Sequence, residues 1–359
     1  MKFPLADWID AHPDCRYDLA SSGMRGSIPP PSWPERRPSA GVVEELRLEL
    51  ADHLRVAPTR LFLSHGASEA NGWVLGHLAR ELGRGQSPPA LRVRYPEYPP
   101  LFDGARAQGF VVHDDGGAVD VAAVSRPRNP EGDLWSAEQL ARFSEGARHL
   151  VVDETFREFT GVPSVSAEGT RGLWATGSFT KFFGADEVRV GFAIAPPEAV
   201  GRFGRYVGLV SDEVAPASAA AALGLLRNLP GVRAAVRAVV DRNLRAWARG
   251  FPGTRPPTGP THFDRSGRAS GRRLAERCLA ASVLVCPGGF FGDPGGVRIC
   301  LTRRDFPSGL RAYLRVRGPV PVRSAGTARV GPLDRATELQ PERPLRGGGG
   351  RIGRRGRPR

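Results

Sequence analysis

Short apolar runs alternate with helical stretches over the first two hundred residues of the chain. Runs typical of buried strands occur at residues 60–64, 90–95, 109–113, 119–125, 149–154, 173–179 and 190–196. Between them, apolar residues recur at helical spacing, and we expect helices to begin at Ser68, near Tyr98 and at Ser136. This alternation predicts an α/β fold in which a mainly parallel mixed sheet is sandwiched by helices.

A different pattern begins beyond about residue 200. An Ala-, Leu- and Arg-rich helical region covers roughly 214–250, and we expect it to be interrupted at Pro230. Apolar runs at 261–265, 282–286 and 297–301 and a helical stretch at 269–281 follow. They predict a smaller α+β domain at the C-terminal side.

The beginning of the chain shows neither pattern. Residues 21–38 are rich in Pro, Gly and Ser and predict an extended arm, followed by a helix with Ser39 as its cap. We therefore divide the chain into four parts. These are an N-terminal arm (1–38), a large domain (39–212), a small C-terminal domain (213–318) and a disordered basic tail (319–359).

Composition narrows the class of protein. An apolar content of 40% and a charged content of 25% are typical of a soluble globular protein. We expect no membrane span, because no run of about 18 apolar residues occurs, and no secretory signal, because the N-terminus lacks an apolar core. Cys15, Cys278, Cys286 and Cys300 show neither a CxxC pair nor metal-ligand spacing. We interpret them as thiols of a cytoplasmic protein without a metal site.

The last 41 residues contain ten arginines and three acidic residues, a net charge of +7 (10 − 3). This is half of the net charge of +14 of the whole chain. This segment has few large apolar residues, which predicts a solvated tail. Binding of nucleic acid by the tail is the alternative. The body of the chain does not favour it, because charges of both signs are interspersed there.

One lysine is conspicuous in a chain that otherwise uses arginine. Among 51 basic residues only Lys2 and Lys181 are lysines, which leaves 49 arginines (51 − 2). Arginine stays protonated, whereas a desolvated lysine can lose its proton and form a Schiff base with a carbonyl. Ser178, Thr180 and Arg189 offer phosphate ligands beside Lys181. The pattern suits pyridoxal 5'-phosphate (PLP), a phosphate-bearing aldehyde; an ordinary surface lysine is the alternative.

Residues suited to the rest of such a cofactor occur at successive predicted strand ends. A helix N-terminus can bind the phosphate, and the candidates there are Gly66, Ala67 and Ser68. Asp153 is placed to keep the pyridine nitrogen protonated, Asn129 to donate to the phenolic oxygen, and Tyr98 to cover the ring. Each alone is equally an ordinary turn or capping residue, but their joint occurrence favours the cofactor site.

These motifs resemble fold-type-I PLP-dependent enzymes of the class I/II aminotransferase superfamily, most of all the histidinol-phosphate aminotransferase-like branch, which also holds threonine-phosphate decarboxylase. The resemblance covers roughly residues 17–315, and its most specific segments are "LVVDETFREF" and "GSFTKFFGADEVRVGFAIAP". It implies that Lys181 forms the internal aldimine, Asp153 pairs with the pyridine nitrogen and Asn129 with the phenolic oxygen. It further implies that the phosphate is bound by Ala67, Ser68, Ser178 and Arg189. Tyr98 would stack on the ring, and Arg298 would bind the substrate carboxylate.

The implied function is transfer of an amino group between an amino acid and a 2-oxo acid, by a cytoplasmic homodimer of amino acid biosynthesis. Three positions depart from the family pattern: Phe156 and Arg37 replace tyrosines, and Glu131 replaces a threonine. The changes at Phe156 and Glu131 motivate an alternative, a PLP-dependent amino acid (phosphate) decarboxylase. A second alternative is a non-catalytic nucleic-acid-binding or regulatory protein on this fold.

Overall fold

A computed structural model of the protein describes residues 4–39, 41–83, 87–114, 117–167, 169–265 and 270–318. The basic tail predicted for residues 319–359 lies outside the described residues. Within the described parts, no helix is both long and apolar enough to cross a membrane.

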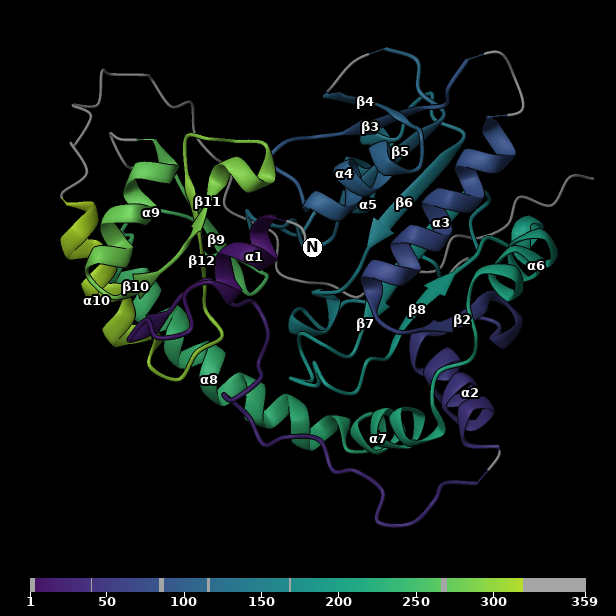
Figure 1. The fold of residues 1–359 in the computed structure, drawn as a ribbon, viewed down its shortest axis with the longest axis horizontal. Helices are drawn as coiled ribbons and strands as arrows, with labels where there is room; N and C mark the ends of the chain where they lie inside the picture. The colour runs from purple at the N-terminus through teal and green to yellow at the C-terminus, as the bar shows by residue number, and fades with distance from the viewer. Residues whose placement is uncertain are drawn as a thin grey trace, which may run out of the picture. The chain divides into compact units, whose positions relative to one another are not determined.

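The centre of the fold is a seven-stranded sheet with the strand order β2-β8-β7-β6-β5-β3-β4 (Figure 1). Its strands are β2 (Leu61–Ser64), β3 (Ala90–Val93), β4 (Val111–Asp114), β5 (Val121–Ser125), β6 (His149–Asp153), β7 (Leu173–Ser178) and β8 (Gly191–Ile194). Only β8 runs antiparallel to its neighbours, β2 and β7, and all other neighbours are parallel. The predicted mainly parallel mixed sheet is therefore confirmed.

Helices cover both faces of this sheet, because alternate residues of its strands point to opposite sides. Val121 and Ala123 of β5 pack in one core with α3, α4 and α6, whereas Ala122 and Val124 pack in another with α5. A third core joins β7 and β8 to α2 and α7. The bounds are α2 (Val42–Leu54), α3 (Ala67–Leu82), α4 (Pro99–Ala107), α5 (Ala137–Phe143), α6 (Val200–Val210) and α7 (Pro216–Arg227).

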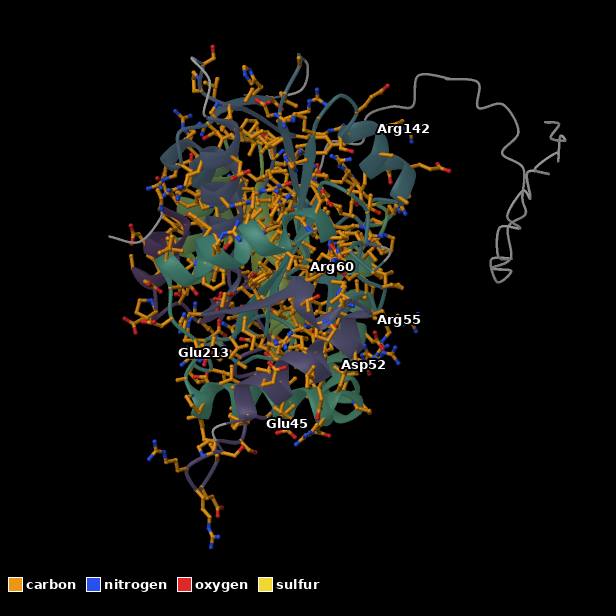
Figure 2. The ribbon with its side chains drawn as sticks, turned by 90° about the vertical axis from the view of Figure 1, so that its right-hand side faces the viewer. Glu45, Asp52, Arg55, Arg60, Arg142 and Glu213 are labelled. Carbon is orange, nitrogen blue, oxygen red and sulfur yellow. The ribbon has the colours of Figure 1, made fainter. Side chains whose placement is uncertain are left out.

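Helix α2 shows how the sequence pattern selects the buried face. Leu46 and Leu50 are buried, whereas Glu45 and Asp52 are exposed on the surface (Figure 2). The prediction that Ser39 caps this helix is wrong. The helix begins after Gly41, so Ser39 lies too far upstream for its hydroxyl to reach the first free amides and contributes only its carbonyl, to Val42 N at 3.3 Å.

Two other helix predictions hold. Ser136 caps α5, where its hydroxyl accepts from Gln139 N at 3.2 Å. The long helical region is divided at Asn228 into α7 and α8 (Leu229–Gly250). Pro230 lies in the first turn of α8, where its missing N–H is not needed.

The C-terminal part forms a second, smaller assembly of strands and helices. Its three-stranded antiparallel sheet has the order β11-β12-β9, and β10 pairs in parallel with β1. The elements are β9 (Thr261–Asp264), α9 (Gly271–Ala280), β10 (Val283–Leu284), β11 (Cys286–Pro287), β12 (Val297–Cys300) and α10 (Phe306–Arg317). Their core includes Trp247, Ile299 and Tyr313.

The N-terminal segment is not only an extended arm. It contributes α1 (Pro4–Asp10) and β1 (Tyr17–Asp18) to the C-terminal assembly, close to β11 in Figure 1. Leu5 and Trp8 are buried in that core, and Trp8 Nε1 donates to Val285 O at 2.8 Å. These apolar residues explain the difference, because they bring a short amphipathic helix onto the small sheet. The four-part division of the chain stays a prediction.

Candidate active site

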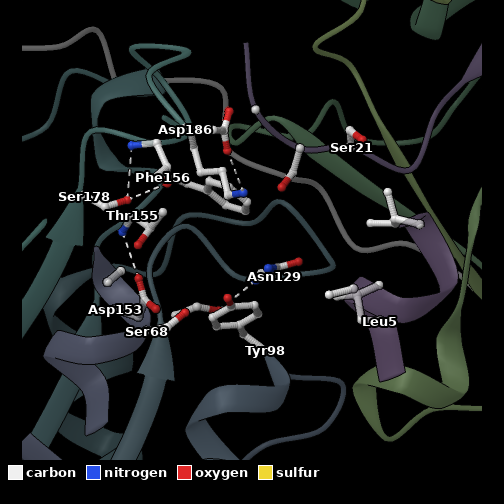
Figure 3. A pocket seen from close by; sticks show the side chains of 18 of the residues that line it. Leu5, Ser21, Ser68, Tyr98, Asn129, Asp153, Thr155, Phe156, Ser178 and Asp186 are labelled. Atoms are coloured by element: carbon white, nitrogen blue, oxygen red, sulfur yellow. Dashed lines mark hydrogen bonds and ion pairs between the residues drawn. The ribbon is translucent and has the colours of Figure 1, made fainter. Parts of the chain in front are cut away.

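A cavity of about 380 Å³ lies at the carboxyl ends of the parallel strands. Ser125, Asp153 and Ser178 end β5, β6 and β7 and line one side, as Figure 3 shows for the last two. Leu5 of α1 lies on the opposite side in Figure 3, and Arg298 of β12 also lines the cavity. All predicted site residues except Gly66 line this cavity: Ala67, Ser68, Tyr98, Asn129, Asp153, Ser178, Lys181, Arg189 and Arg298.

Lys181 lies in the loop that follows β7. Phe179, Phe182 and Phe183 are buried in the core on either side of it, so the loop is anchored, while Thr180, Lys181, Asp186 and Arg189 of this loop line the cavity. Burial lowers the pKa of Lys181, and the positive charge of Arg298 lowers it further. The carboxylate of Asp186, 3.9 Å from Nζ, opposes this shift. A lysine in such surroundings is a better nucleophile near neutral pH than an exposed one.

Asp153 is a buried carboxylate whose two oxygens are held in place. Oδ2 accepts from Asn71 Nδ2 at 2.8 Å, and Oδ1 accepts from Thr155 N at 2.9 Å. Asn71 in turn accepts from Thr176 Oγ1 at 2.7 Å. Burial raises the pKa of Asp153, and the hydrogen bonds from Thr155 and Asn71 oppose this. A cationic ring nitrogen would supply the positive partner that such a buried carboxylate needs.

The N-terminus of α3 and Arg189 form a cradle for an anion. Gly66 has φ +117°, which L side chains rarely adopt, and a Cβ there would lie 2.7 Å from Arg189 Nη2, so the guanidinium would have to move. Gly66 thus makes space beside the cavity instead of lining it. Ser178 and Thr180 bring two hydroxyls 2.7 Å apart to the same end of the cavity. These donors suit a phosphate group.

Asn129 and Arg298 form a hydrogen-bonded pair in the wall of the cavity. Arg298 Nη1 donates to Asn129 Oδ1 at 3.0 Å and Nη2 donates to Ala20 O at 2.7 Å, while Nε is buried without a partner. Asn129 N donates to Ser125 Oγ at 2.8 Å, and Ser125 is hydrogen-bonded to the buried Glu97. With Oδ1 occupied, the amide group of Asn129 keeps its Nδ2 donors for a ligand.

Tyr98 stands directly before α4 and lines the cavity. Burial and the charge of Asp153 raise the pKa of Tyr98 to about 12, and a side-chain hydrogen bond with Ser68 opposes the shift. The phenol therefore stays neutral at physiological pH, which suits a ring that covers another ring.

The three departures from the family pattern have different positions. Phe156 lines the cavity and is buried, so it presents a ring without a hydrogen-bond donor. Glu131 lies outside the cavity and pairs with Arg265 at 3.1 Å and Arg128 at 3.5 Å. Arg37 is exposed and also lies outside the cavity. Only the change at Phe156 therefore alters the wall of the site.

Sequence reasoning missed several residues of this site. Asn71 and Thr155 contact Asp153, and Asp186 faces Lys181. The signal for Asn71 was its spacing, one helical turn after Ala67 on the same face of α3. Asp186 had no signal of its own, because an acidic residue in a polar loop is usually solvated.

The site fits PLP in shape and donor set. It offers the amine of Lys181 for the aldehyde and the carboxylate of Asp153 for the ring nitrogen. The amide of Asn129 suits the phenolic oxygen, and the anion cradle suits the phosphate. Two buried polar atoms near it, Thr155 Oγ1 and Arg298 Nε, have no partner in the described chain. In the same residues, no cluster of His, Cys, Asp and Glu suits a metal ion. Fold and site together define an enzyme that works with a phosphate-bearing aldehyde cofactor.

The chain belongs to the aminotransferase class I and II family, whose sequence model matches residues 107–306. It is 28% identical over 296 residues to the 3-methylarginine biosynthesis aminotransferase ArgM of Streptomyces arginensis, covering 69% of this chain and 74% of that relative. It is 27% identical over 163 residues to histidinol-phosphate aminotransferase 2 of Archaeoglobus fulgidus, covering 43% of this chain and 47% of that one.

A PLP-dependent aminotransferase from Streptococcus suis has the same fold, with a TM-score of 0.73 at 17% identity, covering 89% of this chain and 100% of that one. The predicted family, fold class and cofactor are thus confirmed. The comparisons support a PLP-dependent aminotransferase in general.

Proposed function

We propose that this protein attaches PLP through Lys181 and transfers the amino group of an amino acid to a 2-oxo acid. The observation that carries the proposal is the convergence of Lys181, Asp153, Arg189 and Arg298 on one cavity. Each is a residue type that one part of the cofactor or substrate requires. Asp153 comes from β6, Arg298 from β12, and Lys181 and Arg189 from the loop between β7 and β8.

Bound PLP would supply an electron sink conjugated to the substrate Cα. Asp153, fixed by Asn71 and Thr155, would hold the proton on the ring nitrogen and so keep the ring electron-poor. Asn129 Nδ2 would donate to the phenolic oxygen, and Arg189 with the first turn of α3 would hold the phosphate.

Arg298 orients the substrate by gripping its α-carboxylate. The guanidinium is 2% exposed, and its unpaired Nε–H gives it a donor to offer. Lys181 would take the proton from the substrate Cα and carry it until it is returned, because its Nζ lies in the cavity and burial lowers its pKa. Leu5 and the rest of α1 limit the access of water to this step.

The first test is the visible absorbance of protein purified with PLP and then dialysed, for wild type, Lys181→Ala and Lys2→Ala. Lys2 is the matched control because it is the one other lysine of the chain. We expect the cofactor band in wild type and Lys2→Ala and its loss in Lys181→Ala. Borohydride reduction should then add the cofactor mass to the peptide that contains Lys181. A wild-type protein without a band would refute the proposal.

The second test identifies the bond that is broken. A panel of amino acids should convert the bound cofactor to pyridoxamine phosphate and yield 2-oxo acids. Release of carbon dioxide without a 2-oxo acid would instead establish the decarboxylase that Phe156 motivated.

The setting of the reaction is also proposed here. We place it in amino acid biosynthesis, in the cytoplasm and in a homodimer, on the support of family membership and of Cys15, Cys278, Cys286 and Cys300, which are all free thiols. Light scattering of the purified protein tests the dimer.

A further inference from the structure

The acidic partner of Lys181 comes from its own loop. Lys181 Nζ lies 3.9 Å from Asp186 Oδ1, the one ion pair of this lysine among the described residues. Both side chains line the cavity, with exposed fractions of 31% and 29% (Figure 3 labels Asp186). The pair therefore sits where the cofactor's aldehyde would bind, half-shielded from solvent.

The position of Asp186 is fixed from two sides. Its carbonyl accepts from Arg189 Nη1 at 3.3 Å, which ties it to the arginine of the anion cradle. Gly23 packs against the pair, since a Cβ there would lie 3.6 Å from both Asp186 Oδ2 and Lys181 Cδ. Met24 N also donates to Lys181 O at 2.8 Å. The N-terminal segment therefore packs against the ion pair.

Other charged groups that face Lys181 cannot replace Asp186. Asp153 of β6 also acts on Lys181 through its charge, but the proposed function assigns its carboxylate to the ring nitrogen, and among the described residues it forms no ion pair with Lys181. Arg298 of β12 and Arg189 of the same loop are positive and repel a charge on Nζ. Cys300 of β12 donates its thiol to Ala20 O, and burial raises its pKa, so it stays neutral.

We propose that Asp186 is the counter-ion of Lys181 and a positioning residue for the proton that this lysine carries. Its carboxylate holds positive charge on Nζ both while the amine is free and while it is bonded to the cofactor. The inference rests on the proposed function. An opposite charge at about 4–6 Å moves a titration midpoint by about one to three pH units. Without Asp186, burial and two arginines act on Nζ with less opposition.

The test is a pH titration of the visible absorbance of the PLP-loaded protein, for wild type, Asp186→Asn and Glu187→Gln. Glu187 is the matched control, because it is exposed, adjacent, and carries the same charge outside the cavity. We expect the Asp186→Asn midpoint to fall by about one pH unit or more, and the Glu187→Gln midpoint to stay within a few tenths of wild type. Asp186→Glu should have a midpoint closer to wild type than Asp186→Asn, because it keeps the negative charge.

The outcomes separate the two proposals. A wild-type protein without a cofactor band overturns the proposed function. A normal band with equal midpoints in Asp186→Asn and Glu187→Gln overturns only the role of Asp186. Should Asp186→Asn fail to fold, Asp186→Ser provides the same charge removal in a smaller side chain, and its midpoint decides in the same way.

Discussion

Asn71 connects the stability of the protein to the binding of its cofactor, and Asn71→Ala tests that connection. The side chain is completely buried in α3 and bridges two strands of the sheet. It donates to Asp153 Oδ2 at 2.8 Å and accepts from Thr176 Oγ1 at 2.7 Å. The substitution removes both bonds and leaves both partners buried.

The size of the effect follows from these two bonds. A hydrogen bond to a charged group contributes about 1.5–3 kcal/mol, and a buried hydroxyl without a partner costs about 1–3 kcal/mol. The free energy of unfolding should therefore fall by about 3–5 kcal/mol. Asp153 also loses a bond that favours its ionised form, so its pKa, already raised by burial, rises further. More of it is then protonated and unable to pair with a cationic ring.

We expect the affinity for PLP to fall about tenfold, equivalent to about 1.4 kcal/mol, with a larger loss at lower pH because a raised pKa keeps Asp153 protonated there. Titration of the apoprotein with PLP, followed by protein fluorescence, measures this. The control is Asn243→Ala in α8, equally buried, whose side chain donates to Leu301 O at 2.8 Å and Arg303 O at 2.7 Å. It should lose similar stability and no affinity. Equal affinities of the two variants would refute the role of Asp153 at the ring nitrogen.

Three further predictions concern other parts of the molecule. Arg298→Lys keeps the charge but loses the planar fork, so kcat/KM for amino acids should fall about 100-fold while the cofactor band persists; an undiminished kcat/KM would contradict carboxylate binding there. Gly66→Ala places a Cβ 2.7 Å from Arg189 Nη2 and should weaken PLP binding about tenfold. Gly117→Ala, also at positive φ (+80°) but with open space around it, should not; equal affinities would show that the room beside Arg189 is irrelevant. Burial lowers the pKa of His77 to about 4. At a pH above the unfolded-state pKa of about 6.5, His77 is neutral in both states and does not affect stability. Between about pH 6.5 and about pH 4 only the unfolded chain binds the extra proton, which lowers the free energy of unfolding by about 2 kcal/mol at about pH 5. His77→Phe keeps the ring beside Trp174 and should remove that part of the acid sensitivity in denaturant unfolding, whereas an unchanged difference between about pH 7.5 and about pH 5 would show that His77 does not titrate on unfolding.

The sequence allowed the central sheet and the strand-end residues to be predicted, because buried strands and their polar ends leave a local pattern. Lys181 was found for a compositional reason, since arginine is used almost everywhere else. The cap at Ser39 failed because a capping hydroxyl acts over only two or three residues, and one shift of the helix start removes it.

The residues that hold the site residues in place could not be predicted in the same way. Asn71 meets Asp153 across 82 positions of sequence, and the N-terminal segment meets Lys181 only after the chain has folded back on itself. Long-range contacts of this kind depend on the packing of α3 and of the arm, and no local pattern encodes them. Glu131 shows the converse, because a conspicuous change in the sequence turned out to face two arginines outside the cavity.

The hydrogen bond between Arg298 and Asn129 has a thermodynamic consequence. The same amide group faces the proposed carboxylate site through Oδ1 and the proposed cofactor site through Nδ2, so the two ligands share one side chain. Linkage requires that any factor by which one ligand tightens the other acts equally in both directions. A carboxylate that increases the affinity for PLP about tenfold must itself bind about tenfold more tightly to the loaded protein. With such coupling, the concentration of carboxylate ligands helps to set the fraction of the protein that holds its cofactor at equilibrium.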